Sequence, residues 1–149
     1  MTAWELLMTT IAYKDGVIAY DGRITRGNQI TYDDFDKCLE RDGVKFVCSG
    51  STADFESIIS AYFGNEVTSC GAVALIVADG VVWHSAVDET SGFWKSALIQ
   101  DRPYALGSGS EHALTAMDMG ATAYQAVEMA MKRDNCTGGK IRTLTIKAE

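Results

Sequence analysis

The segment TTIAYKDGVIAYDG, residues 9–22, places two threonines at the start of a pattern typical of a β-hairpin. A threonine hydroxyl is a weak nucleophile until a neighbouring group takes its proton. A threonine at the N-terminus of a chain carries such a base itself, because a free α-amine has a pKa of about 7.7–8.0. Thr9 would therefore supply both the nucleophile and the general base, provided that it is the first residue of the chain.

A site of this kind needs three further groups, and the sequence offers a candidate for each. A buried cation would hold the hydroxyl and the amine in their reactive ionisation states, a carboxylate would hold that cation, and a backbone N–H would stabilise the oxyanion. The candidates are Lys37, Asp21 and Gly50. Each also has an ordinary interpretation, as a solvated lysine in an acidic stretch, a turn residue and a strand-end glycine.

Other kinds of catalytic site are less well supported by the sequence. A Ser-His-Asp triad would have only His84 and His112 to draw on, and the segment LGSGSE does not match the G-x-S-x-G pattern. The glycines of GSGSEH lack the remaining residues of a phosphate-binding loop. The cysteines form no CxxC pair and have no metal-type spacing, so the sequence predicts reduced structural thiols, no metal and no cofactor; they are Cys38, Cys48, Cys70 and Cys136.

The periodicity of apolar residues predicts strands, a helix, further strands, two helices and a final strand. Thr9 is expected to begin the first strand, and a capping box at Thr122 and Gln125 is expected to begin the last helix. Two sheets packed between helices would bury the apolar faces of these elements, which predicts an α+β fold. The first helix is expected within 51–64, capped by Ser51 or Thr52 and ended by Gly64. The expected strands lie within residues 9–13, 17–19, 27–32, 44–51, 72–88, 91–99, 104–110 and 138–149.

The order and spacing of several short motifs resemble those of proteasome β subunits and of HslV, the bacterial proteasome-like peptidase. The motifs are TTIAYKDGVIAYDG, GN, the lysine at 37, SGSTAD, YALGSGS and RDNCTGG, and the match covers nearly the whole chain from Thr9 onward. The resemblance implies an N-terminal nucleophile (Ntn) hydrolase with a four-layer αββα sandwich. The short stretch NEVTSCG stands where that family usually has a second long helix, so a compact variant lacking one outer-layer helix is expected.

The same resemblance implies a role for each residue of the candidate site. Thr9 would be the nucleophile and base, Asp21 would orient Lys37, and the Gly50 N–H would serve the oxyanion. Ser108 and Asp134 would steady the amine and hydroxyl of the threonine. The expected supporting residues are Arg23 and Thr137, and the expected substrate-binding residues are Thr25, which would pair with the substrate backbone, and Ile24, Phe35, Cys48 and Thr52, which would line a specificity pocket.

Residues 1–8, MTAWELLM, precede the expected domain at 9–149. They are interpreted as a propeptide or as a mis-annotated start, with translation beginning at Met8. Removal of Met1 would expose another N-terminal threonine, but Thr2 lies outside the strand pattern. The state of the Thr9 amine therefore decides whether the site can act.

Charge and hydropathy limit the partners. The 149-residue chain has 13 lysines and arginines against 20 aspartates and glutamates, a formal net charge of −7, which argues against nucleic acid and anionic membranes. No apolar stretch approaches the roughly 20 residues of a membrane span, and residues 1–8 lack the basic region of a secretion signal. We therefore expect one domain in a cytoplasmic protein.

The function expected from the sequence is that of a threonine endopeptidase, which cleaves polypeptides through an acyl-enzyme ester on Thr9. The resemblance implies a self-compartmentalised homo-oligomer, a ring, that an ATP-dependent unfoldase feeds. Two alternatives remain open: a catalytically silent assembly or binding protein of the same fold with an unprocessed N-terminus, and an amidase of the same class that acts on small molecules.

Overall fold

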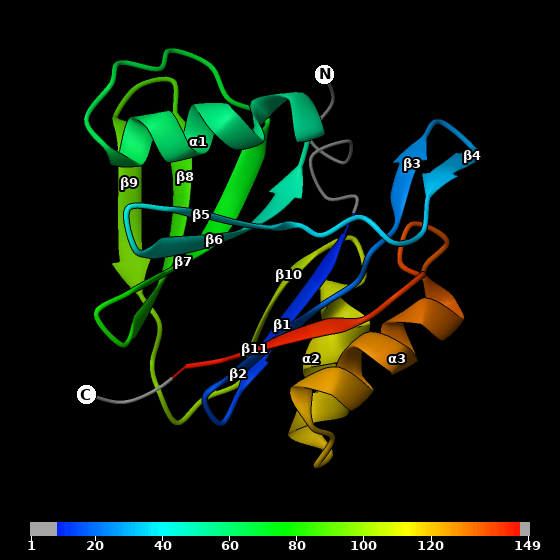
Figure 1. Ribbon diagram of the computed structural model, residues 1–149. Helices are drawn as coiled ribbons and strands as arrows, with labels where there is room; N and C mark the ends of the chain where they lie inside the picture. The colour runs from blue at the N-terminus through cyan, green and yellow to red at the C-terminus, as the bar shows by residue number, and fades with distance from the viewer. Residues whose placement is uncertain (1–8, 147–149) are drawn as a thin grey trace.

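A computed structural model describes residues 9–146, which form a mixed α/β arrangement of three α-helices and antiparallel sheets (Figure 1). The strands are β1 (Thr10–Lys14), β2 (Val17–Tyr20), β3 (Ile24–Arg26), β4 (Gln29–Tyr32), β5 (Cys38–Arg41), β6 (Val44–Gly50), β7 (Ala72–Ala78), β8 (Val81–Asp88), β9 (Gly92–Ala97), β10 (Tyr104–Gly107) and β11 (Arg142–Thr145). The helices are α1 (Phe55–Tyr62), α2 (Ser110–Asp118) and α3 (Ala123–Arg133).

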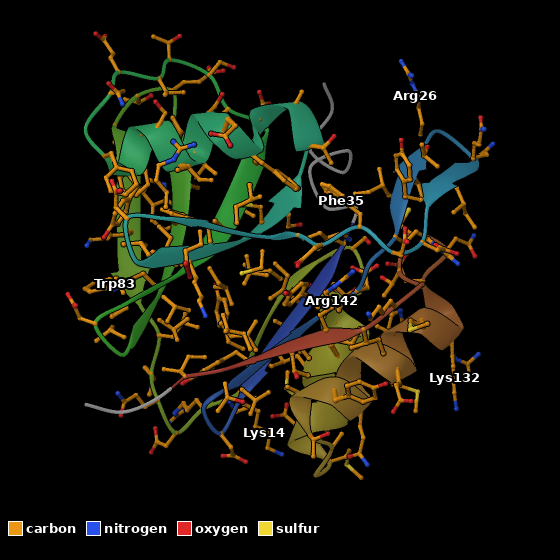
Figure 2. All side chains as sticks on the ribbon, in the orientation of Figure 1. Lys14, Arg26, Phe35, Trp83, Lys132 and Arg142 are labelled. Atoms are coloured by element: carbon orange, nitrogen blue, oxygen red, sulfur yellow. The ribbon has the colours of Figure 1, made fainter. Side chains whose placement is uncertain are left out.

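The strands form one four-stranded sheet, one five-stranded sheet and a separate hairpin. The four-stranded sheet has the order β10-β1-β2-β11, and the five-stranded sheet follows the chain from β5 to β9. β1 and β2 are joined by Asp15 and Gly16, both at positive φ (52° and 77°), which is the tight turn that the Asp-Gly sequence predicts. β3 and β4 pair only with each other, and Figure 2 shows Arg26 pointing away from the body of the protein at the end of this hairpin.

The apolar side chains of these elements pack in three clusters. Alternate residues of β1 point to opposite faces, so Ile11 packs against the five-stranded sheet while Ala12 packs against α2 and α3. On the far side of the five-stranded sheet, Phe46 packs against Ile58 and Ile59 of α1. Figure 1 accordingly shows α1 on one outer face and α2 with α3 on the other, with the two sheets between them.

One helix covers the outer face of the five-stranded sheet. Within residues 9–146, the segment 65–71 that follows α1 forms no helix and leads directly into β7. The Asp54 carboxylate, directly before α1, accepts the Gly71 N–H at 2.7 Å, and the Ser51 N–H donates to the Gly71 carbonyl at 2.9 Å. The short segment therefore leaves this layer with α1 alone, as expected from its length.

Several local predictions need correction. The first helix begins at Phe55, after a 3₁₀ turn at Thr52–Asp54, so its N-cap is Asp54 and not the predicted Ser51 or Thr52. Asp54 makes no side-chain cap, because its carboxylate accepts the Gly71 N–H instead. The strand β4 lies within the predicted run 27–32, whereas β3 before it was not predicted; Gly27, at φ 60°, lies in the turn between the two strands.

Three further local predictions can be compared with the structure. Thr9 lies just before β1 rather than within it. The strand β5 was not predicted, because its sequence CLER and the acidic residues around it read as a solvated segment. The capping box is confirmed: the Gln125 N–H donates to Thr122 Oγ1 at 3.1 Å, and the Thr122 N–H donates to Gln125 Oε1 at 3.0 Å.

Among the described residues, no helix is long and apolar enough to cross a membrane.

Candidate active site

Thr9 lies directly before β1, beside the last residue of β10. Its side chain is buried, with 2% of its surface exposed. Thr10, the next residue, pairs with Gly107 at the end of β10. Gly107 has φ 100°, and a Cβ atom built there would overlap the Thr9 carbonyl group. The backbone of Thr9 can therefore approach β10 this closely only because residue 107 has no side chain.

The Thr9 hydroxyl contacts a buried ion pair. Lys37 Nζ donates a hydrogen bond to Thr9 Oγ1 and lies 2.7 Å from Asp21 Oδ1. Thr9 Oγ1 also lies 3.2 Å from Asp21 Oδ1. The side chains of Lys37 and Asp21 are only 1% and 0% exposed. The structure thus brings together the three residues that the sequence predicted as nucleophile, cation and orienting carboxylate, although their roles stay predictions.

The environment of Lys37 makes its proton easier to remove than that of an exposed lysine. Burial lowers the pKa of the Lys37 ammonium, whereas the charge and the hydrogen bond of Asp21 oppose that effect. The positive charge of Arg23 adds a smaller lowering. Lys37 is therefore a group that can exchange a proton with the Thr9 hydroxyl, because the two are in direct hydrogen-bond contact.

Backbone N–H groups hold the Asp21 carboxylate from both sides. The Thr10 N–H donates to Asp21 Oδ1 at 3.2 Å, and the Gly138 N–H donates to Asp21 Oδ2 at 3.0 Å. These two donors fix the position of the carboxylate beside Lys37. The sequence prediction missed Gly138, although the glycine pair after RDNCT was a signal that a backbone approaches another group closely there.

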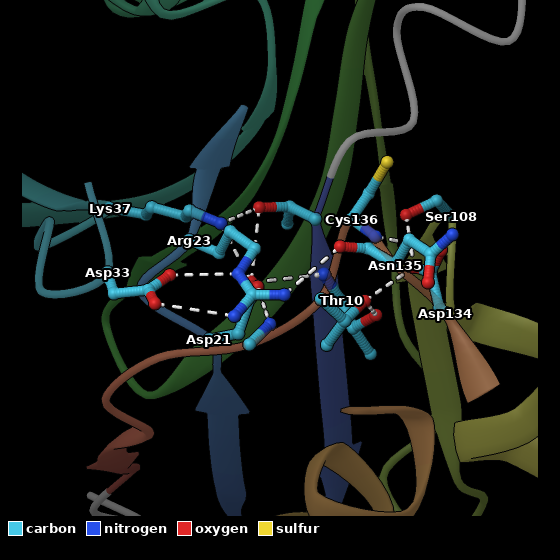
Figure 3. Close-up of polar contacts among 12 residues, drawn as sticks. Thr10, Asp21, Arg23, Asp33, Lys37, Ser108, Asp134, Asn135 and Cys136 are labelled. Atoms are coloured by element: carbon cyan, nitrogen blue, oxygen red, sulfur yellow. Dashed lines mark hydrogen bonds and ion pairs between the residues drawn. The ribbon is translucent and has the colours of Figure 1, made fainter. Parts of the chain in front are cut away.

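Arg23 fixes the loop that carries Gly138. Its guanidinium forms an ion pair with Asp33, with Nε 2.8 Å from Oδ1, and donates to the Asn135 carbonyl at 3.1 Å (Figure 3). A Cβ atom at position 138 would overlap the guanidinium, so Gly138 lets Arg23 lie flat against the loop. Arg23 thus contacts the loop whose Gly138 N–H donates to Asp21, and its predicted supporting role stays a prediction.

A second polar cluster forms around Asp134. Ser108 Oγ and Thr137 Oγ1 both donate to Asp134 Oδ2 at 2.5 Å, and Thr137 Oγ1 lies 2.6 Å from Thr10 Oγ1. The side-chain hydrogen bonds of Thr9 Oγ1 within residues 9–146 go to Lys37 and Asp21. Among the described residues, Ser108 and Asp134 make no hydrogen bond to Thr9 Oγ1, and Thr10 lies between the two clusters. Their expected role of steadying the amine and hydroxyl of Thr9 stays a prediction.

Gly50, the predicted oxyanion donor, lies at the end of β6 with φ 108°. Two residues earlier on the same strand, the Cys48 N–H donates to the Lys37 carbonyl at 2.9 Å. Gly50 is thus on the strand that adjoins Lys37, at the position where the chain turns toward α1. Its function as a hydrogen-bond donor to substrate remains a prediction.

The predicted substrate-binding residues are not all at one surface. Ile24 and Thr25 are half-buried on β3, and the buried Thr25 hydroxyl has no hydrogen-bond partner among the described residues. Cys48 is fully buried in the cluster that includes Phe55 of α1, and burial raises the pKa of its thiol. The Phe35 ring lies 6.4 Å from the Phe55 ring, between α1 and the hairpin of β3 and β4 (Figure 2), whereas Thr52 is exposed.

The contact between Gly107 and Thr9 can be tested by substitution. Gly107→Ala should lower the free energy of unfolding through both the strained backbone, about 1–2 kcal/mol, and the overlap with the Thr9 carbonyl, about 1–3 kcal/mol more. Gly120→Ala is the matched control, because Gly120 has φ 109° but open space around it. Urea unfolding of both variants checks this, and equal losses would show that the contact with Thr9 is unimportant.

Within residues 9–146, no group of three or more His, Cys, Asp or Glu side chains is arranged to hold a metal ion. The polar groups gathered at Thr9 are instead its hydroxyl, the Lys37 ammonium, the Asp21 carboxylate and the backbone N–H groups that donate to that carboxylate. This set can activate a hydroxyl nucleophile and bind a developing negative charge.

Comparison with known proteins gives a likeness of fold. No protein-family model matches the chain, and no curated protein sequence does. A solved structure of Thiobacillus denitrificans BPH is similar, with a TM-score of 0.67 and 19% sequence identity over 95% of this chain and 99% of that one. The structure of Thiobacillus denitrificans BPH in complex with epoxomicin has a TM-score of 0.66 and 19% identity over 93% and 98% of the two chains.

Proposed function

We propose that this protein is a threonine peptidase of the Ntn hydrolase class, in which Thr9 becomes the first residue and cleaves peptide bonds. The observation that carries the proposal is the contact of the buried Thr9 hydroxyl with Lys37 and Asp21. A buried ion pair is costly to desolvate and contributes little to stability on its own. A catalytic use of the pair explains why a lysine and an aspartate lie inside the protein beside a hydroxyl.

The arrangement of the layers and the structural likeness support this proposal. Two sheets packed face to face, with α1 outside one and α2 and α3 outside the other, fit the αββα sandwich of that class. One similar structure is that of a complex with epoxomicin, a proteasome inhibitor. We propose by analogy that the site of this chain also binds peptide-like inhibitors.

The proposed reaction uses the residues at Thr9 in two steps. Thr9 Oγ attacks the carbonyl carbon of the scissile peptide bond while its proton passes to the free α-amine, with Lys37 stabilising the developing alkoxide. The carbonyl oxygen gains the negative charge, which the Gly50 N–H would bind. When the C–N bond breaks, the leaving amine takes the proton and the acyl group stays on Thr9 as an ester. Water then attacks the ester and releases the carboxylic acid and the free hydroxyl.

A covalent probe tests the proposed nucleophile. Protein whose first residue is Thr9 should form one adduct with a peptide epoxyketone, located at Thr9 by mass spectrometry, because such probes react with a hydroxyl and an amine on the same residue. Thr9→Ala should abolish the adduct, whereas Thr90→Ala, in the turn between β8 and β9, should leave it unchanged. An adduct at another residue, or full labelling of the Thr9→Ala protein, would refute the proposal.

A substrate panel separates peptidase from amidase activity. Hydrolysis of peptide substrates that Thr9→Ala abolishes is the expected result. Hydrolysis of small acyl amides without any cleavage of peptides would instead assign the protein as an amidase of the same class.

A further inference from the structure

The hydrogen bonds around Asp134 have a definite direction. Thr137 Oγ1 donates its single hydrogen to Asp134 Oδ2, at 2.5 Å, because an ionised carboxylate can only accept. The hydroxyl of Thr137 therefore has no hydrogen left for its other neighbour. In the 2.6 Å contact between Thr10 Oγ1 and Thr137 Oγ1, Thr10 must be the donor. A chain of hydrogen bonds thus runs from Thr10 through Thr137 to Asp134.

Thr10 also contacts the other carboxylate of the site. Its backbone N–H donates to Asp21 Oδ1 at 3.2 Å, and its carbonyl accepts the Asp21 N–H at 3.3 Å. One residue, adjacent to the proposed nucleophile, is therefore bonded directly to Asp21 and, through Thr137, to Asp134. In Figure 3, Thr10 lies between Lys37 and Asp21 on one side and Ser108 and Asp134 on the other.

The surroundings of Thr10 leave its hydroxyl little freedom. The side chain is fully buried. A Cβ atom at Gly109 would overlap Thr10 Oγ1 and would lie 3.0 Å from Thr137 Oγ1, so the absence of a side chain at 109 makes room for this pair of hydroxyls. A hydroxyl that is enclosed in this way and donates to a single acceptor holds that acceptor in place.

We infer that Thr10 is a positioning residue of the proposed hydrolase. Its hydroxyl fixes Thr137 and Asp134, and with them residues 134–138, relative to Thr9. This inference rests on the proposed function. The same loop donates the Gly138 N–H to Asp21, which holds Lys37 at the Thr9 hydroxyl. A shift of the loop would therefore change the position of the carboxylate on which Lys37 depends.

Thr10→Val and Thr10→Ser test the inference, because valine keeps the branched shape without the hydroxyl and serine keeps the hydroxyl. In protein beginning at Thr9, Thr10→Val should lower kcat about tenfold and leave KM within about twofold, since the loss of one hydrogen bond disturbs the reacting groups rather than the binding of substrate. Thr10→Ser should stay within about threefold of the wild-type kcat. Thr143→Val, at an exposed strand residue of the same sheet, is the control and should change nothing.

A double-mutant cycle with Thr137→Val shows whether Thr10 acts through Thr137. If it does, the double variant should lose no more activity than Thr137→Val alone. Additive losses, or a Thr10→Val kcat equal to wild type, would overturn the inference. If Thr10→Val does not fold, the cycle is run with Thr10→Ala in its place. If Thr10→Ser then lowers kcat as much as Thr10→Ala does, the hydroxyl is not what matters, and the inference is overturned. Absence of a Thr9 adduct in the wild-type protein would refute the proposed function itself, which is a separate outcome.

Discussion

Replacing Lys37 with methionine is expected to lower kcat/KM by about 10²–10⁴-fold, the range of a lost proton-transfer or charge-stabilising group. Methionine has nearly the length of lysine but cannot donate to Thr9 Oγ1 or pair with Asp21. The Thr9 hydroxyl would then keep only its contact with a carboxylate, which does not stabilise an alkoxide. Peptide hydrolysis and the rate of epoxyketone labelling measure the effect. Lys132→Met, which removes an exposed lysine of α3, is the control.

The folding of this variant needs a separate control. Removing Lys37 leaves the Asp21 carboxylate buried without a cation, which costs about 3–5 kcal/mol. The double variant Asp21→Asn/Lys37→Met removes both charges and should regain most of that stability while remaining inactive. If the double variant is stable and hydrolyses peptides at the wild-type rate, the ion pair has no part in catalysis.

The pH dependence of stability gives an independent check on the burial of Lys37. Because burial lowers the pKa of Lys37 in the folded protein, the unfolded chain binds this proton more tightly than the folded one. Below the pKa of Lys37 in the folded protein, the buried ammonium lowers the free energy of unfolding by its full amount. This loss disappears as the pH rises toward the pKa of Lys37 in the unfolded chain. Wild-type protein should therefore gain stability relative to the double variant between neutral and alkaline pH, as measured by urea unfolding. A constant difference would contradict this.

Features that depend on neighbouring residues could be predicted from the sequence. The Asp15-Gly16 turn and the capping box at Thr122 were predicted because a few adjacent residues determine them. The contact among Thr9, Asp21 and Lys37 is different, since Thr9 and Lys37 lie 28 positions apart in the sequence. Only the resemblance to a known family placed these residues together. Without that resemblance, the acidic residues around Lys37 predict an exposed lysine, whereas the fold buries it beside Asp21 and Thr9.

The missed features depend on contacts between distant backbones. The Gly138 N–H on Asp21 joins residues 117 positions apart, and nothing in the segment TGGK specifies that partner. The hydroxyl of Thr10 likewise reads as an ordinary strand threonine until β1 is placed beside Thr137, 127 positions away. Hydrogen bonds of this kind follow from the packing of the two sheets and the helices, which local periodicity does not determine.

The state of the N-terminus should decide whether the protein is active at all. In a chain that retains residues 1–8, which lie outside the described residues, the nitrogen of Thr9 is part of a peptide bond and cannot act as a base. Such protein should show no measurable peptide hydrolysis. A chain translated from Met8, with the methionine removed because threonine is small, should begin with a free Thr9 amine and be active.

The longer chain could also reach this state by cleaving itself. The Thr9 hydroxyl contacts Lys37 and can attack the carbonyl carbon of Met8, with Gly50 binding the oxyanion. The hydroxyl proton passes to the Thr9 nitrogen as the C–N bond breaks, which frees the amine. The Met8 acyl group would move from nitrogen to oxygen, and water would then release residues 1–8 and the free Thr9. If this occurs, Lys37→Met in the full chain should block the loss of residues 1–8, while the chain translated from Met8 still loses its methionine.

Intact-mass measurement alongside a peptidase assay over time distinguishes these routes. The expected result is that hydrolysis rises only in proportion to the molecules that begin at Thr9, whichever route produces them. If the chain translated from Met8 is active but the full-length protein neither becomes shorter nor hydrolyses peptides, the protein does not remove residues 1–8 by itself. Hydrolysis by a sample in which every molecule still begins at Met1 would refute the mechanism, because no free amine would be present at Thr9 to take the proton.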